Sequence, residues 1–145
     1  MLKNIDPLLT PELLHVLASM GHGDELVLCD ANFPAASVAR STVHGRPIHL
    51  AGADAPTAVA AILSVLPLDS FVPAPVARME VTGEPDSVPD VQREVQDLVG
   101  EVPMEPIERL SFYEKAKTAF AVVATGERRF WGCFIFQKGV IAPDD

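Results

Sequence analysis

The residues of this sequence best suited to acid–base chemistry lie close together near the N-terminus. The stretch MGHGDELVLCDANFP, residues 20–34, places His22 between two glycines, and two carboxylates, Asp24 and Asp30, follow it. Histidine is the side chain whose ordinary pKa lies nearest neutrality, so it is the natural group for proton transfer at physiological pH. Taken alone, the pattern fits an active site or a solvated turn that contains a histidine.

Two elements must position these groups. The apolar spacing within residues 8–21 predicts a helix, with Thr10 as its N-cap, Pro11 at its first position and Gly21 past its end. The next segment, ELVLCD (residues 25–30), shows no alternation of polar and apolar residues until its end. Such a run is typical of a strand that is buried on both faces in a parallel sheet.

The two candidate groups are expected at opposite ends of that strand. Asp30 lies at its carboxyl end, which is where open α/β sheets bind their ligands. His22 lies in the turn before the strand, so about six residues at ~3.3 Å each separate it from Asp30. One subunit would therefore keep them apart unless the chain folds back.

Helix and strand patterns alternate along the rest of the chain. Helices are predicted at residues 31–40, 54–67, 87–100 and 111–119, and extended segments at 46–51, 71–82 and 105–110. Residues 119–125 and 130–140 predict a C-terminal β-hairpin around the turn GERR. These patterns predict an α/β fold, a compact single domain over residues 1–145 with a mostly parallel central sheet flanked by helices.

Two of these helices carry more detailed predictions. In residues 87–100, the spacing of Val91, Val95, Leu98 and Val99 predicts one apolar face, with Gly100 past the helix end. In residues 111–119, Ser111 and Glu114 predict a capping box that opens the helix.

Composition excludes several kinds of partner. The 145 residues carry a net charge of −9, which disfavours nucleic acid, anionic membranes and anionic substrates, and favours a neutral substrate. No apolar stretch approaches the ~20 residues of a membrane helix, and no signal peptide is visible. The two cysteines lie in apolar segments, as buried thiols of a cytoplasmic protein do, and no motif indicates a metal site.

The block from MLKNIDPLL to CDANFPA, with FYEKAKTAFAVVATGERRFWG and KGV near the C-terminus, resembles the RbsD/FucU family of L-fucose mutarotases and D-ribopyranases. The most specific part is the helix followed by G-H-x-D and a strand that ends in D-A. MGHGDE and DANFP are similar to the fucose branch, whereas the ribose branch tends to read H-T-D and D-A-G-x-P.

This resemblance implies a fold, an assembly and a reaction. Members of the family are compact α/β subunits assembled into rings, often decamers, with the active site near subunit contacts. A neighbouring subunit could then complete the site. The implied reaction interconverts the anomers of L-fucose by opening and closing the sugar ring, which requires no cofactor.

The resemblance also assigns roles to individual residues. It implies that His22 is the proton donor and that Asp30 and Arg109 bind the sugar. Asp24 can support His22 or belong to the turn. Tyr113 can supply a hydroxyl or belong to the core.

The chain departs from the family in one motif. The family's Tyr-Gly-Asn falls on Trp131, Gly132 and Cys133, which we therefore expect at the sugar. Trp131 can still stack on an apolar sugar face, but the tyrosine hydroxyl is lost, and a thiol cannot replace the two-way hydrogen bonding of an amide. Pyranose–furanose interconversion of D-ribose, or sugar binding without turnover, therefore remain alternative functions.

Overall fold

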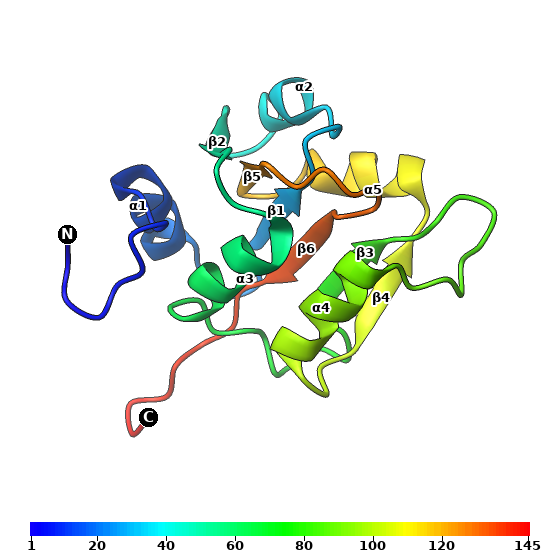
Figure 1. Cartoon of the computed structure of the whole chain (residues 1–145). Helices are drawn as coiled ribbons and strands as arrows, with labels where there is room; N and C mark the ends of the chain where they lie inside the picture. Colours follow the sequence, from blue (N-terminus) through cyan, green and yellow to red (C-terminus); the bar gives the residue numbers. More distant parts are fainter.

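The computed structural model describes residues 1–145 and is built on a six-stranded mixed sheet with the order β2-β5-β1-β6-β3-β4 (Figure 1). The strands are β1 (Glu25–Cys29), β2 (Pro47–Leu50), β3 (Val76–Met79), β4 (Met104–Ile107), β5 (Ala121–Thr125) and β6 (Phe134–Gln137). The helices are α1 (Pro11–Ser19), α2 (Ala35–Ala39), α3 (Ala55–Leu63), α4 (Asp90–Val99) and α5 (Arg109–Ala116). The predicted alternation of helices and strands is confirmed.

Strand β1 lies in the middle of the sheet. It pairs in parallel with β5 on one side and antiparallel with β6 on the other, where Leu28 is opposite Phe134. Only β6 runs against the other five strands, so the prediction of a mostly parallel sheet is confirmed. The apolar run of β1 is buried on both faces, as its lack of polar alternation predicts.

Both C-terminal strands are present, but the predicted hairpin between them is wrong. β5 and β6 run in opposite directions without pairing, because β1 lies between them. The connection over residues 126–133 therefore crosses the carboxyl end of β1 rather than making a tight turn. The physical reason is the burial of β1. Its backbone N–H and C=O groups are shielded from water, so they need hydrogen-bonding strands on both edges.

The helices cover the two faces of the sheet. One hydrophobic cluster joins α1, α3 and α4 to the sheet, and a smaller one joins α2 and α5 to the opposite face. In Figure 1, α3 and α4 lie in front of the sheet and α5 lies behind it. Alternate residues of β1 serve the two clusters, with Leu28 in the first and Cys29 in the second. No helix has both the length and the apolar character that a membrane crossing requires.

The helix starts show where local sequence signals hold. Thr10 and Asp54 cap α1 and α3 by accepting hydrogen bonds from backbone N–H groups, as predicted for Thr10. The capping box predicted at Ser111 is wrong, because α5 begins earlier. The carboxylate of Glu108 accepts the N–H of Ser111 at 3.0 Å and is the N-cap.

The buried face of α4 differs from its prediction at one position. Val91, Val95 and Val99 are buried, but Leu98 is 44% exposed and Gln92 is fully buried in its place. Burial of this amide is tolerated because it is fully hydrogen-bonded. It donates to two backbone carbonyls and accepts from the guanidinium of Arg78.

Candidate active site

Five of the residues that the sequence singles out line one cavity at the carboxyl end of β1. The cavity is about 150 Å³ in volume and is lined by Asp30, Asn32, Phe33, Met79, Arg109, Tyr113, Phe130, Trp131 and Cys133. Pockets that hold drug-sized ligands measure about 300–1,000 Å³, so this cavity suits a smaller molecule. Its wall is mostly apolar, with a few polar groups that can orient a ligand.

Asp30 provides the carboxylate of the cavity. It follows the last residue of β1 and is only 6% exposed. Its Oδ1 accepts the backbone N–H of Asn32 at 2.9 Å, and the N–H of Ala31 donates to the carbonyl of Glu127 at 2.8 Å. These bonds fix the turn, so the position of the carboxylate is set before a ligand arrives.

Arg109 and Tyr113 enter the cavity from the first turns of α5. The guanidinium carbon of Arg109 lies 5.6 Å from the centroid of the Tyr113 ring, and that ring packs edge-on against Phe33 at 5.3 Å. No carboxylate lies within ion-pair distance of Arg109. Its N–H groups are therefore available to a ligand, and cation–π attraction to Tyr113 orients them. Tyr113 is half-buried beneath the guanidinium, as part of the cavity wall.

Trp131 is held in an uncommon backbone conformation at the edge of the cavity. Its φ is +68°, in the left-handed region that non-glycine residues seldom adopt. Its carbonyl accepts the side-chain N–H of Gln92 at 2.9 Å, which ties this segment to α4. The next residue must be glycine, since a Cβ at Gly132 would lie 2.9 Å from Cγ of Glu127. Backbone strain of this kind is typical of ligand sites.

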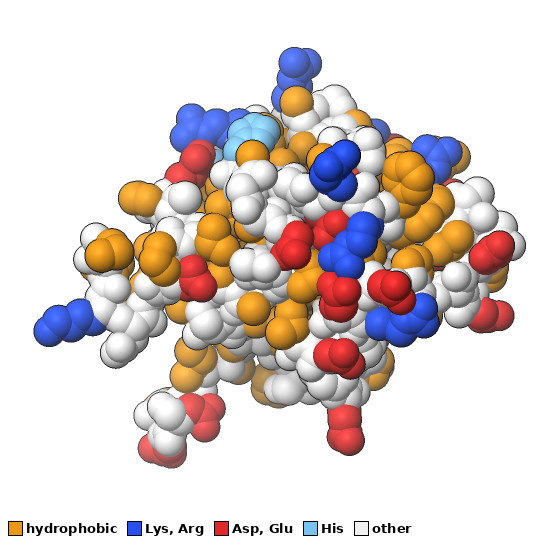
Figure 2. Space-filling view, in the orientation of Figure 1, with side chains coloured by type: hydrophobic (Ala, Val, Ile, Leu, Met, Phe, Trp, Pro, Cys, Tyr) orange, Lys and Arg blue, Asp and Glu red, His pale blue; other side chains and the backbone are white.

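Glu127 anchors the segment that carries Trp131. Its buried carboxylate accepts from the backbone and guanidinium of Arg129 and from the N–H of Ala55, the first residue of α3. Arg129 also binds both carboxylate oxygens of Glu94 on α4. Hydrogen bonding from Arg129 lowers the pKa of Glu127 from 4.5 to about 2. Acidic and basic side chains lie side by side over this face (Figure 2).

Cys133 lines the cavity as a neutral thiol. The residue is 1% exposed, and its burial, followed by the neighbouring charge of Asp30, raises the pKa of the thiol. It stays protonated at neutral pH and adds apolar volume where an amide would add two polar groups. Hydrogen bonds to a ligand must therefore come from the other polar residues that line the cavity, among them Asp30 and Arg109.

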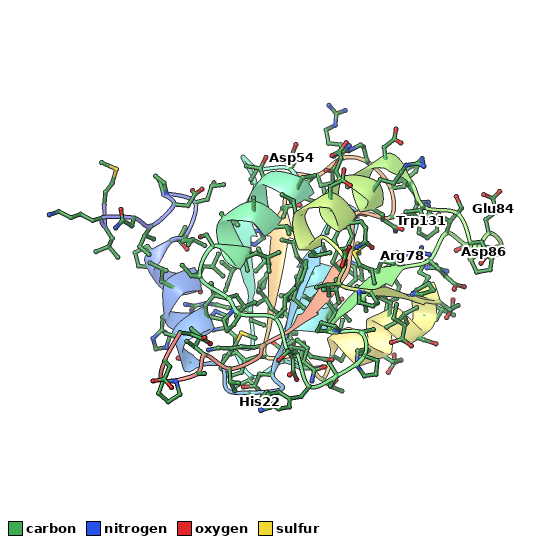
Figure 3. All side chains as sticks on the ribbon, turned by 90° about the horizontal axis from the view of Figure 1, so that it is seen from below. His22, Asp54, Arg78, Glu84, Asp86 and Trp131 are labelled. Atoms are coloured by element: carbon green, nitrogen blue, oxygen red, sulfur yellow. The ribbon has the colours of Figure 1, made fainter.

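His22 does not reach this cavity within one chain. It lies before β1, at the end of the strand opposite to Asp30, as predicted, and Figure 3 shows it far from Trp131. Its Nε2 is 3.1 Å from Oδ1 of Asp69. Asp24 instead accepts the N–H of Gly21 at 2.7 Å, so of the two roles considered for Asp24 the structure shows the turn.

Sequence reasoning missed several residues that lie beside His22 or line the cavity. Asp69, the partner of His22, is 47 positions away in the chain and has no local motif. Phe130 and Met79 reach the cavity only because β6 lies next to β3. Phe33 was within reach of prediction, since it belongs to the DANFP stretch that also contains Asp30.

A mixed sheet with a small cavity at the strand ends, lined by a carboxylate, an arginine and aromatic rings, defines an α/β protein with a candidate site for a small polar ligand. The family model described as "RbsD / FucU transport protein family" matches residues 3–141. The chain belongs to this family.

Named relatives cover nearly the whole chain. A fucose mutarotase of Danio rerio is 44% identical over 99% of this chain and 97% of its own length. The crystal structure of protein Atu2016, a putative sugar binding protein, is 53% identical with a TM-score of 0.95, over 98% of this chain and 97% of that one. The fucose mutarotase of Streptococcus pneumoniae, solved in complex with L-fucose, is 35% identical with a TM-score of 0.86, over 97% of this chain and 100% of that one.

The buried carboxylate of Glu127 predicts a specific acid sensitivity. Because its pKa is about 2 in the folded chain and ordinarily 4.5, its stabilisation is present above pH 4.5 and is lost as pH falls toward 2. We expect Glu127→Gln to lower the free energy of unfolding by about 3 kcal/mol at pH 7, with the gap to wild type closing in acid. Urea titrations from pH 7 to pH 3 measure this gap.

Glu94→Gln is the matched control, since it removes the other carboxylate bound to Arg129. Glu94 is solvent-exposed, so this change should cost about 0–1 kcal/mol, with little pH dependence. Equal losses for the two variants would contradict the anchoring role of Glu127.

Proposed function

We propose that this chain is a fucose mutarotase, an isomerase that interconverts the α and β anomers of L-fucose without a cofactor. The observation that carries the proposal is the convergence of Asp30, Arg109 and Trp131 on one small cavity in a chain so similar to named fucose mutarotases. The unit that performs this function is a single mutarotase domain spanning residues 1–145.

The chemistry requires only proton movement. The anomeric hydroxyl loses a proton while the ring oxygen gains one, the bond between C1 and the ring oxygen breaks, and C1 becomes an aldehyde. Rotation about the bond to C2 presents the other face of the aldehyde, and the reverse steps close the ring. No atom or electron is gained overall, so an acid–base group that works near neutral pH is sufficient.

The cavity offers complementary contacts to such a sugar. The carboxylate of Asp30 can accept hydrogen bonds from two hydroxyls, and the unpaired N–H groups of Arg109 can donate to sugar oxygens. Trp131 and Phe33 provide apolar area for the ring face and for the methyl group of a 6-deoxy sugar. Cys133 completes this wall, whereas Gly132, expected at the sugar from the sequence, is not among the residues that line the cavity.

We propose that His22 of a neighbouring copy supplies the proton-transfer group, in a homo-oligomeric ring that we take to be a decamer. Supporting this, His22 is 46% exposed and packs against the exposed ring of Phe71, while Phe130 is exposed beside the cavity. Two exposed aromatic rings, one at each end of the sheet, fit a head-to-tail contact. The two buried free thiols support a cytoplasmic location.

His22→Ala should abolish exchange between the anomers, because the variant lacks the group that moves protons near neutral pH. Saturation-transfer NMR with L-fucose and with D-ribose measures the exchange, and circular dichroism checks the fold. Faster exchange with D-ribose would favour the ribopyranase alternative. A wild-type protein that binds L-fucose but does not exchange its anomers would instead be a sugar-binding protein. Normal exchange by the folded variant would refute the role of His22.

A shared site predicts recovery of activity in mixed assemblies. His22→Ala and Asp30→Asn subunits should each be inactive alone, but randomly mixed rings contain intact sites wherever the two complement each other. About a quarter of the contacts in an equal mixture have this arrangement, so about a quarter of wild-type activity should return. A mixture that stays inactive, or a monomer near 15.6 kDa by light scattering at micromolar concentration, would refute the shared site.

Trp131 should report sugar binding directly, since it is the only tryptophan in the chain. Its fluorescence should shift on addition of L-fucose. The shift should saturate at millimolar sugar, which corresponds to a binding free energy of roughly −4 kcal/mol. Trp131→Tyr should keep or raise activity, and Trp131→Ala should weaken binding through lost stacking area. Trp131 belongs to the core if Trp131→Ala instead lowers the free energy of unfolding by roughly 3–5 kcal/mol and the emission of the wild-type protein does not change on addition of sugar.

A further inference from the structure

Where the ladder between β3 and β6 ends, a side-chain amide continues the connection between them. A backbone bond at this end joins the N–H of Met79 to the carbonyl of Cys133 at 3.0 Å. Next to it, Nε2 of Gln92 on α4 donates to the carbonyl of Met79 at 2.7 Å and to the carbonyl of Trp131 at 2.9 Å. Two carbonyls can only accept, so they cannot bond to each other, and the two hydrogens of one amide nitrogen join them.

Both of these carbonyls belong to residues that line the cavity. Met79 comes from β3, whereas Trp131 comes from the segment that crosses the carboxyl end of β1. Gln92 itself does not line the cavity and is inaccessible to solvent. Its amide therefore fixes how two parts of the cavity wall lie relative to each other, without contact with a ligand in the cavity.

A buried guanidinium dictates the orientation of this amide. Nη1 of Arg78 donates to Oε1 of Gln92 at 3.0 Å, and an arginine side chain can only donate. The oxygen of the amide must therefore face Arg78, which turns the hydrogens of the nitrogen toward the two carbonyls. Arg78 is only 7% exposed and forms no ion pair with a carboxylate. Its contacts are with neutral oxygens instead.

The loop between β3 and α4 holds Arg78 in place. The guanidinium donates to the carbonyl of Pro85 at 3.2 Å and to the carbonyl of Ser87 at 3.3 Å. Figure 3 shows Glu84 and Asp86 at the outer end of this loop and Arg78 on its inner side. Together with the amide oxygen, these carbonyls give the guanidinium three acceptors, which fix its position.

We propose that Gln92 is a positioning residue for sugar binding and that Arg78 orients it for this role. By holding the carbonyls of Met79 and Trp131 on one nitrogen, Gln92 keeps the indole ring where it can stack on the sugar. The left-handed backbone of Trp131 requires such a restraint, since this conformation persists only where its surroundings determine it. This inference rests on the proposed function, in which Trp131 contacts the sugar.

Two substitutions remove the donors of Gln92 in different ways. Gln92→Glu keeps the shape of the side chain and still accepts from Arg78, but its carboxylate cannot donate to the two carbonyls. Gln92→Met removes every polar atom of the side chain without adding charge. In both variants KM for L-fucose should rise about tenfold while kcat stays within about twofold, because sugar binding is weakened and the proton-transfer group is unchanged.

Gln96→Glu is the matched control. One turn further along α4, Gln96 also donates to two backbone carbonyls, those of Gly100 at 2.8 Å and Val102 at 2.9 Å, but it lies away from the cavity. Its KM should stay within about twofold of wild type, and thermal melts check the fold of all three variants. Wild-type KM in the folded Gln92 variants would overturn the proposal, as would an equal rise of KM in Gln96→Glu.

The emission of Trp131 tests the restraint without any sugar. Because this is the only tryptophan in the chain, quenching of the emission by acrylamide measures how easily its indole ring is reached. Quenching should be about twofold stronger in both Gln92 variants than in wild type, and unchanged in Gln96→Glu. Quenching at the wild-type level in the Gln92 variants would contradict the positioning role.

A double variant tests whether Gln92 acts through Trp131. In the Trp131→Ala background, Gln92→Glu should raise KM by less than about twofold, because no indole ring is left to position. A further tenfold rise in that background would overturn the proposal, since Gln92 would then act on another part of the cavity.

Hydrogen exchange in the wild-type protein tests the same contacts without any variant. The side-chain amide hydrogens of Gln92 should exchange with solvent at least about tenfold more slowly than those of the half-buried Gln96. Equal rates would overturn the proposal. The two hypotheses fail separately. A wild-type protein that does not exchange the anomers of L-fucose refutes the proposed function, whereas normal exchange with unchanged quenching in the Gln92 variants refutes only the role of Gln92.

Discussion

The complete burial of β1 is the constraint on which the rest of this structure depends. Its apolar residues, Leu26–Cys29, are inaccessible to solvent, so both faces and both edges of the strand must be covered by other parts of the chain. β6 therefore pairs with β1 rather than with β5, and its approach carries the Trp131 segment over the carboxyl end of β1, beside Asp30. The cavity exists because a central strand needs two neighbours.

The Trp131 segment shows how buried polar groups hold an unfavourable backbone conformation. The left-handed φ of Trp131 costs on the order of 1–3 kcal/mol and persists only where its surroundings determine it. Here Gln92 binds its carbonyl, while the buried carboxylate of Glu127 fixes the preceding turn to α3. Each of these polar groups is hydrogen-bonded, so their burial is compatible with a stable fold and with a site formed in advance of its ligand.

Local patterns in the sequence predicted the helices and strands well. They predicted less well which of these elements pack or pair with one another. Thr10 and the run of β1 carry signals within a few residues, and both were read correctly. The failures arise from contacts between distant segments. The insertion of β1 between β5 and β6, the burial of Gln92 and the pairing of His22 with Asp69 depend on tertiary packing, which a single sequence does not display. Asp30, Arg109 and Trp131 were placed by family resemblance, and the structure brings them together; their roles stay predictions.

His22 and the cavity lie at opposite ends of one strand. Each subunit therefore carries two different half-sites, a histidine at one end and a cavity at the other. An open row of such subunits leaves one histidine and one cavity idle at its two ends, so n chains make n − 1 complete sites. Closing the row into a cycle makes n sites and leaves no aromatic end exposed to solvent. If sites are shared as proposed, closing the ring therefore has two advantages. It buries the apolar surface at the two ends, and it gives every chain one complete active site.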